Sequence, residues 1–128
     1  MSREIKFRAY NKKTKKMVDA ERLKAMSVFA LEEKLSIDDF IVLPNSEDYP
    51  LMQYTRLKDK NGKEIFEGDI VKGSAYEKEI YTGVVEFYDA SFIMKIDGSK
   101  GYYRLNKMTF QTLEVIGNLY ENKELLND

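Results

Sequence analysis

The sequence predicts an all-β protein with a minor helical part, and three observations lead to that class. Short runs alternate apolar and polar residues, as in residues 4–10, which is the pattern of a strand with one buried face. Turn residues separate these runs, above all Asn61-Gly62 between two apolar runs. Helical spacing occurs within residues 21–35, where Leu23, Met26, Ala30 and Leu31 fit it, and residues 121–126 suit a last helical turn. We therefore expect strands joined by tight turns, with a short helix in the N-terminal part.

The central stretch, residues 51–71, predicts a strand, a tight turn, a second strand and a further turn that leads into a third strand. Asn61-Gly62 marks the first turn, because both residues tolerate the positive φ angles that hairpin loops require. A two-residue loop would place Lys60 opposite Lys63, and two acidic residues opposite each other beside them. Like charges directly opposite each other destabilise an antiparallel pair, so this register is unfavourable.

A three-residue loop over residues 60–62 removes these repulsions. It places Asp59 opposite Lys63, which carries the opposite charge. Asp is favoured at the start of a type I turn, and Gly62 then takes the left-handed position of the accompanying bulge. We therefore predict the three-residue loop, with the further strand pairs Lys58 with Glu64 and Leu57 with Ile65.

The second turn, Glu67-Gly68-Asp69, leads into a strand that begins at Ile70. A Gly-Asp pair followed by an apolar residue and valine is common in small SH3-like barrels, where a tight turn feeds a bent strand. We count five strands of even spacing between residues 51 and 120. After the central stretch, residues 79–88 and 91–96 form a second hairpin around Asp89-Ala90, and residues 97–101 turn the chain into a run at 102–105. Residues 112–120 supply a closing strand, in which Gly117 marks a bulge. Closure into a barrel removes exposed sheet edges, so we predict an SH3-like barrel over residues 51–128.

The N-terminal part predicts a β-hairpin subdomain. Residues 4–10 and 16–20 form its strands, and residues 11–15 form a polar turn between them. Alternation assigns the first strand a buried face and an exposed face. The buried face holds Ile5, Phe7 and Ala9, and the exposed face holds Lys6, Arg8 and Tyr10.

The stretch between the hairpin and the barrel is less regular. We predict a short helix near residues 28–35, although Val28-Phe29 fits a strand equally well. Residues 40–43 predict a short buried strand, and residues 45–50 predict a loop that separates the two parts. The predicted domains are therefore residues 1–50, packed on the barrel, and residues 51–128.

The composition of the 128 residues excludes most catalytic chemistry. The chain has no Cys and no His, which removes thiol chemistry and the usual general base of a catalytic triad. The acidic groups lack the spacing of a calcium-binding loop, and the glycine turn at residues 97–101 lacks the spacing of a phosphate loop. We therefore predict no catalytic residue, no metal and no cofactor. The carboxylate pair Glu67 and Asp69 leaves an enzyme open as a remote alternative. A Ser-Lys dyad is formally open as well, at Ser99-Lys100 or at Ser2 with Lys6.

Hydropathy and charge predict where the protein works. No apolar run is long enough to span a bilayer, and the first residues lack a signal-peptide core, so we expect a cytoplasmic protein without membrane contact. The net charge of −1 is unevenly distributed. Residues 1–24 hold nine Lys/Arg and three Asp/Glu, a net of +6, whereas residues 25–128 hold twelve and nineteen, a net of −7. A basic N-terminal arm suits a nucleic acid or a neighbouring subunit.

Two surfaces are candidates for partner contact. Strand alternation places Tyr54, Arg56 and Lys58 on one face, and Tyr and Arg are favoured residues at protein interfaces. A similar but equally unspecific set is Tyr102-Tyr103-Arg104. The predicted N-terminal hairpin gathers cations that suit nucleic acid, namely Lys6, Arg8, Lys12, Lys13, Lys15 and Lys16.

Three stretches of the sequence resemble the YopX family, whose proteins are encoded by phages and prophages of mostly Gram-positive bacteria. They are residues 7–17, residues 52–71 and residues 114–122, and the middle stretch is the most specific. The family usually has glycine in place of Arg56 and proline in place of Lys123. The resemblance implies an all-β architecture with an SH3-like barrel and self-association, and it implies no biochemical activity.

The leading hypothesis is a non-enzymatic, self-associating interaction module that binds a host or phage protein. Its basis is the lack of catalytic groups, the uneven charge and the Tyr/Arg sets on strands. The alternative is a nucleic-acid-binding accessory factor in phage replication or transcription, which the basic hairpin favours.

Overall fold

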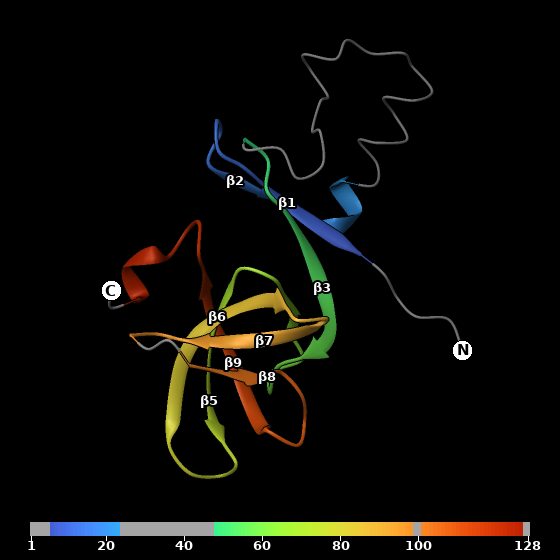
Figure 1. Ribbon diagram of the computed structural model, residues 1–128. Helices are drawn as coiled ribbons and strands as arrows, with labels where there is room; N and C mark the ends of the chain where they lie inside the picture. Colours follow the sequence, from blue (N-terminus) through green and yellow to red (C-terminus); the bar gives the residue numbers. More distant parts are fainter. Residues whose placement is uncertain (1–5, 24–47, 99–100, 127–128) are drawn as a thin grey trace, which may run out of the picture. The chain divides into compact units, whose positions relative to one another are not determined.

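The computed structural model describes residues 6–23, 48–98 and 101–126 (Figure 1). By its internal contacts the chain divides into two units, residues 1–53 and residues 54–128. Strand β3, Leu51–Lys58, runs through this division, and its two halves pair with different strands. The domain boundary predicted after residue 50 stays a prediction.

The first unit contains the predicted N-terminal hairpin. Strand β1, Phe7–Asn11, pairs antiparallel with β2, Lys16–Val18, and with the first residues of β3. The Asn11 side chain closes the turn by accepting hydrogen bonds from the amides of Lys13 and Thr14, at 2.9 and 3.2 Å. Strand β2 ends two residues earlier than predicted, because the next residue, Asp19, begins a helical turn.

Asp19 caps that helical turn over residues 20–23. Its carboxylate Oδ1 accepts a hydrogen bond from the Arg22 amide at 2.8 Å, which satisfies one of the free amides at a helix start. The helix predicted near residues 28–35 and the strand predicted at residues 40–43 lie outside the described residues.

The predicted alternation in β1 is wrong at two positions. Arg8 and Tyr10 were expected on an exposed face, but both are buried, as is Ala9 between them. Strand β1 lies between β2 and β3, and three successive buried residues mean that both of its faces are covered.

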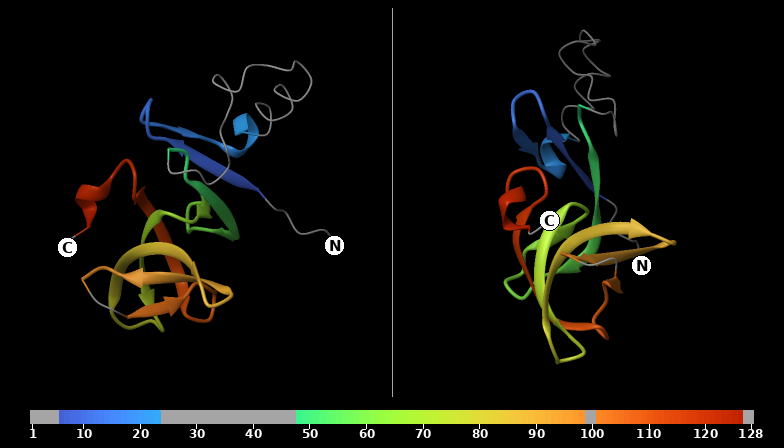
Figure 2. Two further views of the ribbon diagram at one scale, coloured as in Figure 1. Left: turned by 45° about the horizontal axis from the view of Figure 1, so that its top comes forward. Right: turned by 60° about the vertical axis from the view of Figure 1, so that its left-hand side comes forward.

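The second unit is built from strands, which confirms the all-β class. A five-stranded antiparallel sheet runs in the order β8-β7-β6-β5-β9, and Figures 1 and 2 show that its strands bend so that the sheet curls. Seven strands, β3 to β9, lie between residues 51 and 120. They correspond to the three strands of the central stretch and the four later runs, so the predicted count of five was too low. SH3-like closure of the barrel stays a prediction.

The remaining bounds are β4 Glu64–Phe66, β5 Asp69–Ala75, β6 Ile80–Tyr88, β7 Ser91–Ile96, β8 Tyr102–Arg104, β9 Phe110–Asn118 and the 3-10 helix η1 Lys123–Leu125.

The register of the central hairpin confirms the three-residue loop. Lys58 pairs with Glu64, and the Asp59 amide donates to the Lys63 carbonyl at 2.8 Å. The Gly62 amide donates to the Asp59 carbonyl at 2.9 Å, and Gly62 has a φ of 83°, as the bulge requires.

The predicted pair of Leu57 with Ile65 is wrong, because β3 contains a bulge. The neighbouring pairs are Tyr54 with Phe66 and Lys58 with Glu64, so the register shifts between them. Inside the bulge the Thr55 hydroxyl donates to the Ile65 carbonyl at 2.8 Å. Arg56 has a φ of 70°, in the left-handed region.

The core of the second unit lies between the strands of the curled sheet and the central hairpin. Its buried residues come from β4, β5, β6, β7 and β9 and from the turn after β8; they are Ile65, Val71, Ala75, Val85, Met94, Leu105, Phe110 and Leu113. The register of β5 with β9 shifts between the pairs Ile70–Gly117 and Val71–Val115, so a bulge lies beside Gly117, as predicted.

The second predicted hairpin is also confirmed. Strands β6 and β7 pair up to Tyr88 and Ser91, and the loop between them is Asp89-Ala90. Both loop residues have positive φ, 51° and 63°, which is the conformation of a type I′ turn. The tight turn brings the ends of β6 and β7 together at one tip of the sheet.

Candidate functional site

The predicted contact face on β3 is only partly exposed. Tyr54 is 4% exposed and packs against Phe66, with ring centroids 5.4 Å apart. Arg56 and Lys58 are exposed. The bulge at Arg56 breaks the alternation from which a shared exposed face was expected, so Tyr54 contributes to packing. A contact role for Arg56 and Lys58 stays a prediction.

The predicted nucleic-acid residues fall into two groups. Lys12, Lys13, Lys15 and Lys16 are exposed in the turn and at the start of β2. Lys6 is half-buried, and Arg8 is buried in β1. The structure therefore brings four lysines to one turn and leaves Arg8 inside the first unit.

Two buried carboxylates stabilise turns. Asp59 Oδ1 accepts the amides of Asn61 and Lys63 at 2.8 and 2.9 Å, and its Oδ2 accepts the Val115 amide at 2.9 Å. Burial alone would raise the pKa of Asp59, but these three hydrogen bonds together hold it below its usual value. Asp69 Oδ2 accepts the Phe66 amide at 2.8 Å across the turn that precedes β5.

Acidic side chains do not gather into a metal-binding group in the described part of the structure. Within residues 6–23, 48–98 and 101–126, no group of three acidic side chains is placed to hold an ion. In the same ranges no helix is long and apolar enough to cross a membrane.

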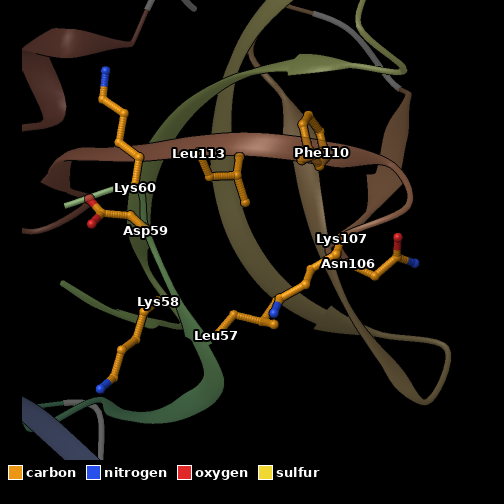
Figure 3. A pocket seen from close by; sticks show the side chains of 8 residues that line it. All are labelled: Leu57, Lys58, Asp59, Lys60, Asn106, Lys107, Phe110 and Leu113. Carbon is orange, nitrogen blue, oxygen red and sulfur yellow. The ribbon is translucent and has the colours of Figure 1, made fainter. Parts of the chain in front are cut away.

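A basic hollow of about 400 Å³ lies between the central hairpin and β9 (Figure 3). Leu57, Phe110 and Leu113 supply its apolar lining, and three lysines line it as well: Lys58, Lys60 and Lys107. Figure 3 shows Lys58 and Lys60 extending in opposite directions, and Lys60 lies 3.7 Å from Glu114. These two cations do not converge, so the hollow lacks the geometry of a single anion site.

A second hollow, the aromatic hollow, lies at the tip of the sheet on β6, β7 and β8. It has a volume of about 270 Å³ and is lined by Glu86, Phe87, Tyr88, Ile93, Lys95 and Tyr102. Tyr88 and Tyr102 are 56% and 45% exposed. Phe87 is 55% exposed, but alternation turns its ring to the opposite face, where it meets Phe92 edge-on with ring centroids 5.2 Å apart. Ile93 is buried.

Strand register assembles the aromatic hollow. Glu86 pairs with Ile93 and Lys95 pairs with Tyr102, so these side chains lie on one face of the sheet. Tyr88 lies on the same face by alternation and meets Tyr102 edge-on, with ring centroids 5.4 Å apart. Residues from three strands therefore form one exposed patch.

Sequence reasoning noticed part of this patch. Tyr102 belonged to the Tyr102-Tyr103-Arg104 set, whereas Phe87 and Tyr88 were not singled out. The signal that could have found them is the Asp89-Ala90 turn, since it places Tyr88 beside the start of β7. The pairing of β7 with β8, which adds Tyr102, agrees with the turn predicted at residues 97–101.

Comparisons with known proteins give a family and a fold. A model of the YopX protein family matches residues 6–127. The chain is similar to the crystal structure of protein EF1440 from Enterococcus faecalis, with 24% identity, a TM-score of 0.62 and coverage of 98% of this chain and 100% of that one. It is also similar to protein yopX from Bacillus subtilis, with 20% identity, a TM-score of 0.58 and coverage of 95% and 98%. A comparison with curated proteins gives no match.

Proposed function

The chain belongs to the YopX protein family, and we propose that it is a non-enzymatic interaction module that self-associates and binds a protein partner. In this proposal it is encoded by a phage or prophage and acts in the cytoplasm of the host. The observation that carries the proposal is the aromatic hollow, where two large rings, Tyr88 and Tyr102, remain exposed and in contact on one face of the sheet. Exposed apolar patches on soluble domains mark contact surfaces, and Tyr and Phe are enriched in interfaces.

The size of the hollow favours a protein side chain as its occupant. Pockets for small molecules have volumes of about 300–1,000 Å³ and enclose most of the ligand. The aromatic hollow, at about 270 Å³, lies below that range, and its rings stand open to solvent. Glu86 and Lys95 at its border supply one charge of each sign, which suits a polar rim around an apolar contact.

The non-enzymatic part of the proposal is supported by the chemistry of the described acids. The chain offers no Cys or His, and the Asp59 and Asp69 carboxylates accept backbone hydrogen bonds inside turns. Carboxylates that are already satisfied by amides in this way are poor general bases, because those hydrogen bonds stabilise the ionised form.

Light scattering and sedimentation over a range of concentrations test the proposal. We expect the wild-type chain to associate reversibly, and Tyr88→Ser to weaken association at least tenfold because it removes one exposed ring. Ile80→Ser is the matched control, since Ile80 is also exposed on β6 but does not line the aromatic hollow. A wild-type chain that stays monomeric at every concentration would remove self-association from the proposal. Equal effects of the two substitutions would remove the aromatic hollow as the contact surface.

The second candidate is nucleic-acid binding, which the four exposed lysines of the β1–β2 turn favour. Four phosphate contacts predict that the logarithm of the binding constant falls with the logarithm of salt concentration with a slope of about −3.6 on duplex DNA. Replacement of Lys12, Lys13, Lys15 and Lys16 by Glu should abolish this binding. An absence of binding to DNA and RNA at low salt would exclude this function.

A further inference from the structure

The two edge strands of the curled sheet, β9 and β8, differ in whether their outward backbone amides and carbonyls have hydrogen-bond partners. The outer edge of β9 is covered by the tip of the central hairpin. The Lys60 amide donates to the Leu113 carbonyl at 2.8 Å, and the Val115 amide donates to the Asp59 carboxylate at 2.9 Å. A covered edge cannot pair with another strand.

The opposite edge strand, β8, is open in the described part of the chain. It pairs only with β7, where the Ile96 amide donates to the Gly101 carbonyl and the Leu105 amide donates to the Phe92 carbonyl, both at 3.0 Å. Backbone groups alternate along a strand, so the amide and carbonyl groups of Tyr102 and Arg104 point away from β7. The Arg104 carbonyl also accepts a hydrogen bond from the Asn106 amide at 3.1 Å. A carbonyl oxygen has two lone pairs, so the second one can still accept a hydrogen bond from another strand.

We propose that β8 pairs antiparallel with β8 of a second copy of this chain, about a twofold axis at Tyr103. In that register Tyr102 lies opposite Arg104 of the second copy, and symmetry repeats the pair. The outward amides and carbonyls of these two residues then hydrogen-bond to each other across the axis. This inference rests on the proposed self-association and names the surface that makes it.

The side chains make the strand complementary to itself. Tyr102 and Arg104 lie on the outer face, where the Arg104 guanidinium donates to the Ser91 hydroxyl at 3.0 Å and is held in place. Each guanidinium would meet a tyrosine ring of the other copy, and the two cations would lie at opposite ends of the pair. An unrelated extended peptide would need the same Tyr and Arg spacing to match, whereas a second copy has it by identity.

The aromatic hollow adjoins this edge. Tyr102 lines the hollow and also belongs to β8, and Tyr88 packs against it. Pairing of two β8 strands would therefore bring the exposed rings of both copies beside one another and remove them from water. The open edge of β8 and the exposed rings beside it therefore both favour a second copy of this chain as the partner.

Backbone pairing is tested first with Tyr102→Pro. Proline lacks the outward amide, and that amide makes no bond within the described sheet, so the fold is preserved. Tyr102→Val is the matched control, because it also loses the ring but keeps the amide. We expect the dissociation constant of the dimer to rise at least tenfold more in Tyr102→Pro than in Tyr102→Val, with equal unfolding midpoints for both variants.

Disulfide trapping tests the register without changing the backbone. The chain has no Cys, so any disulfide that a single-cysteine variant forms must involve the introduced residue. Hydrogen-bonded antiparallel pairs have Cα atoms about 5.5 Å apart, which suits a disulfide. A mixture of Tyr102→Cys and Arg104→Cys should therefore cross-link faster than either variant alone, and Lys72→Cys on the interior strand β5 should not cross-link.

The outcomes separate this inference from the proposed function. If the wild type dimerises but Tyr102→Pro dimerises equally well, or the cysteine mixture shows no preference, the β8 pairing is wrong and self-association by another surface remains. If the wild type is monomeric throughout, both the pairing and the proposed self-association are wrong.

Discussion

Replacement of Asp59 by asparagine tests the link between the central hairpin and β9. The Asp59 carboxylate accepts two amides of its own turn and the amide of Val115 on β9. An asparagine side chain has one oxygen and one NH2 group, so it can keep the turn amides but presents a donor to the Val115 amide. One charge-assisted hydrogen bond is lost and a partly buried amide loses its acceptor, which costs about 2–3 kcal/mol in unfolding free energy.

The stability difference between the wild type and Asp59→Asn should depend on pH. The pKa of Asp59 is lowered in the folded state, because the hydrogen bonds from Val115, Lys63 and Asn61 outweigh the opposing effect of burial. The contribution of the ionised Asp59 carboxylate to the unfolding free energy is therefore fully present above the unfolded pKa of about 3.9. It is lost as the pH falls through the lower pKa of the folded state. The difference between wild type and Asp59→Asn should be constant from about pH 5 to 8 and should shrink below about pH 4.

Urea unfolding at several pH values measures this difference, and Lys60→Ala is the control. Lys60 forms an exposed ion pair with Glu114, and exposed pairs contribute about 0–1 kcal/mol, so this variant should change stability little. An Asp59→Asn protein as stable as the wild type at pH 7 would refute the role of the carboxylate. A difference that persists unchanged at pH 3 would refute the linkage to its ionisation.

Three further predictions follow from the backbone and from one phenol. Arg56→Gly should raise the unfolding free energy by about 0.5–1 kcal/mol. Removal of a left-handed non-glycine residue stabilises the fold by about 1–2 kcal/mol, and the greater backbone freedom of glycine in the unfolded chain costs about 0.5–1 kcal/mol. A loss of stability would mean that the Arg56 side chain makes a compensating contact. Ala90→Gly should also stabilise, by a similar amount, because it completes an Asp-Gly type I′ turn; unchanged urea midpoints would contradict this. Hydrogen bonding with Tyr103 and with Glu79 raises the pKa of Tyr81 to about 12. A spectrophotometric titration should therefore show one late-ionising phenol in the wild type that Tyr81→Phe lacks.

The sequence was sufficient for the central hairpin because its information is local. Asn61-Gly62 selected a hairpin, and the charges of Asp59 and Lys63 selected the loop length that the structure has. The bulge in β3 escaped this reasoning, because the Thr55 hydroxyl takes the Ile65 carbonyl and no periodicity signals such a bond. The resemblance to the family did carry a hint at Arg56, because it led us to expect glycine there, and the φ of 70° at Arg56 is one that glycine adopts readily.

The candidate site was less predictable because it depends on pairing between distant residues. Alternation along β3 suggested Tyr54 as a contact residue, but the bulge and the packing on Phe66 leave it buried. The aromatic hollow needs the registers of β6 with β7 and of β7 with β8 together. Each turn was predicted separately, but the contact of Tyr88 with Tyr102 across three strands depends on both registers. Burial of Arg8 likewise depends on β1 becoming the middle strand between β2 and β3.

The covered edge and the open edge of the sheet together decide what kind of assembly can form. A curled sheet with one open edge pairs once through that edge and gives a closed dimer, whereas a sheet with two open edges can continue into an open array. Asp59 and Lys60 cover β9, so loss of the Asp59 carboxylate should loosen that cover as well as destabilise the fold. We therefore expect Asp59→Ala, under conditions where it is folded, to form species larger than a dimer. Tyr102→Pro in the same chain should reduce these species to dimers at most, because one edge is again closed; arrays that persist in the double variant would show that edge pairing does not build them.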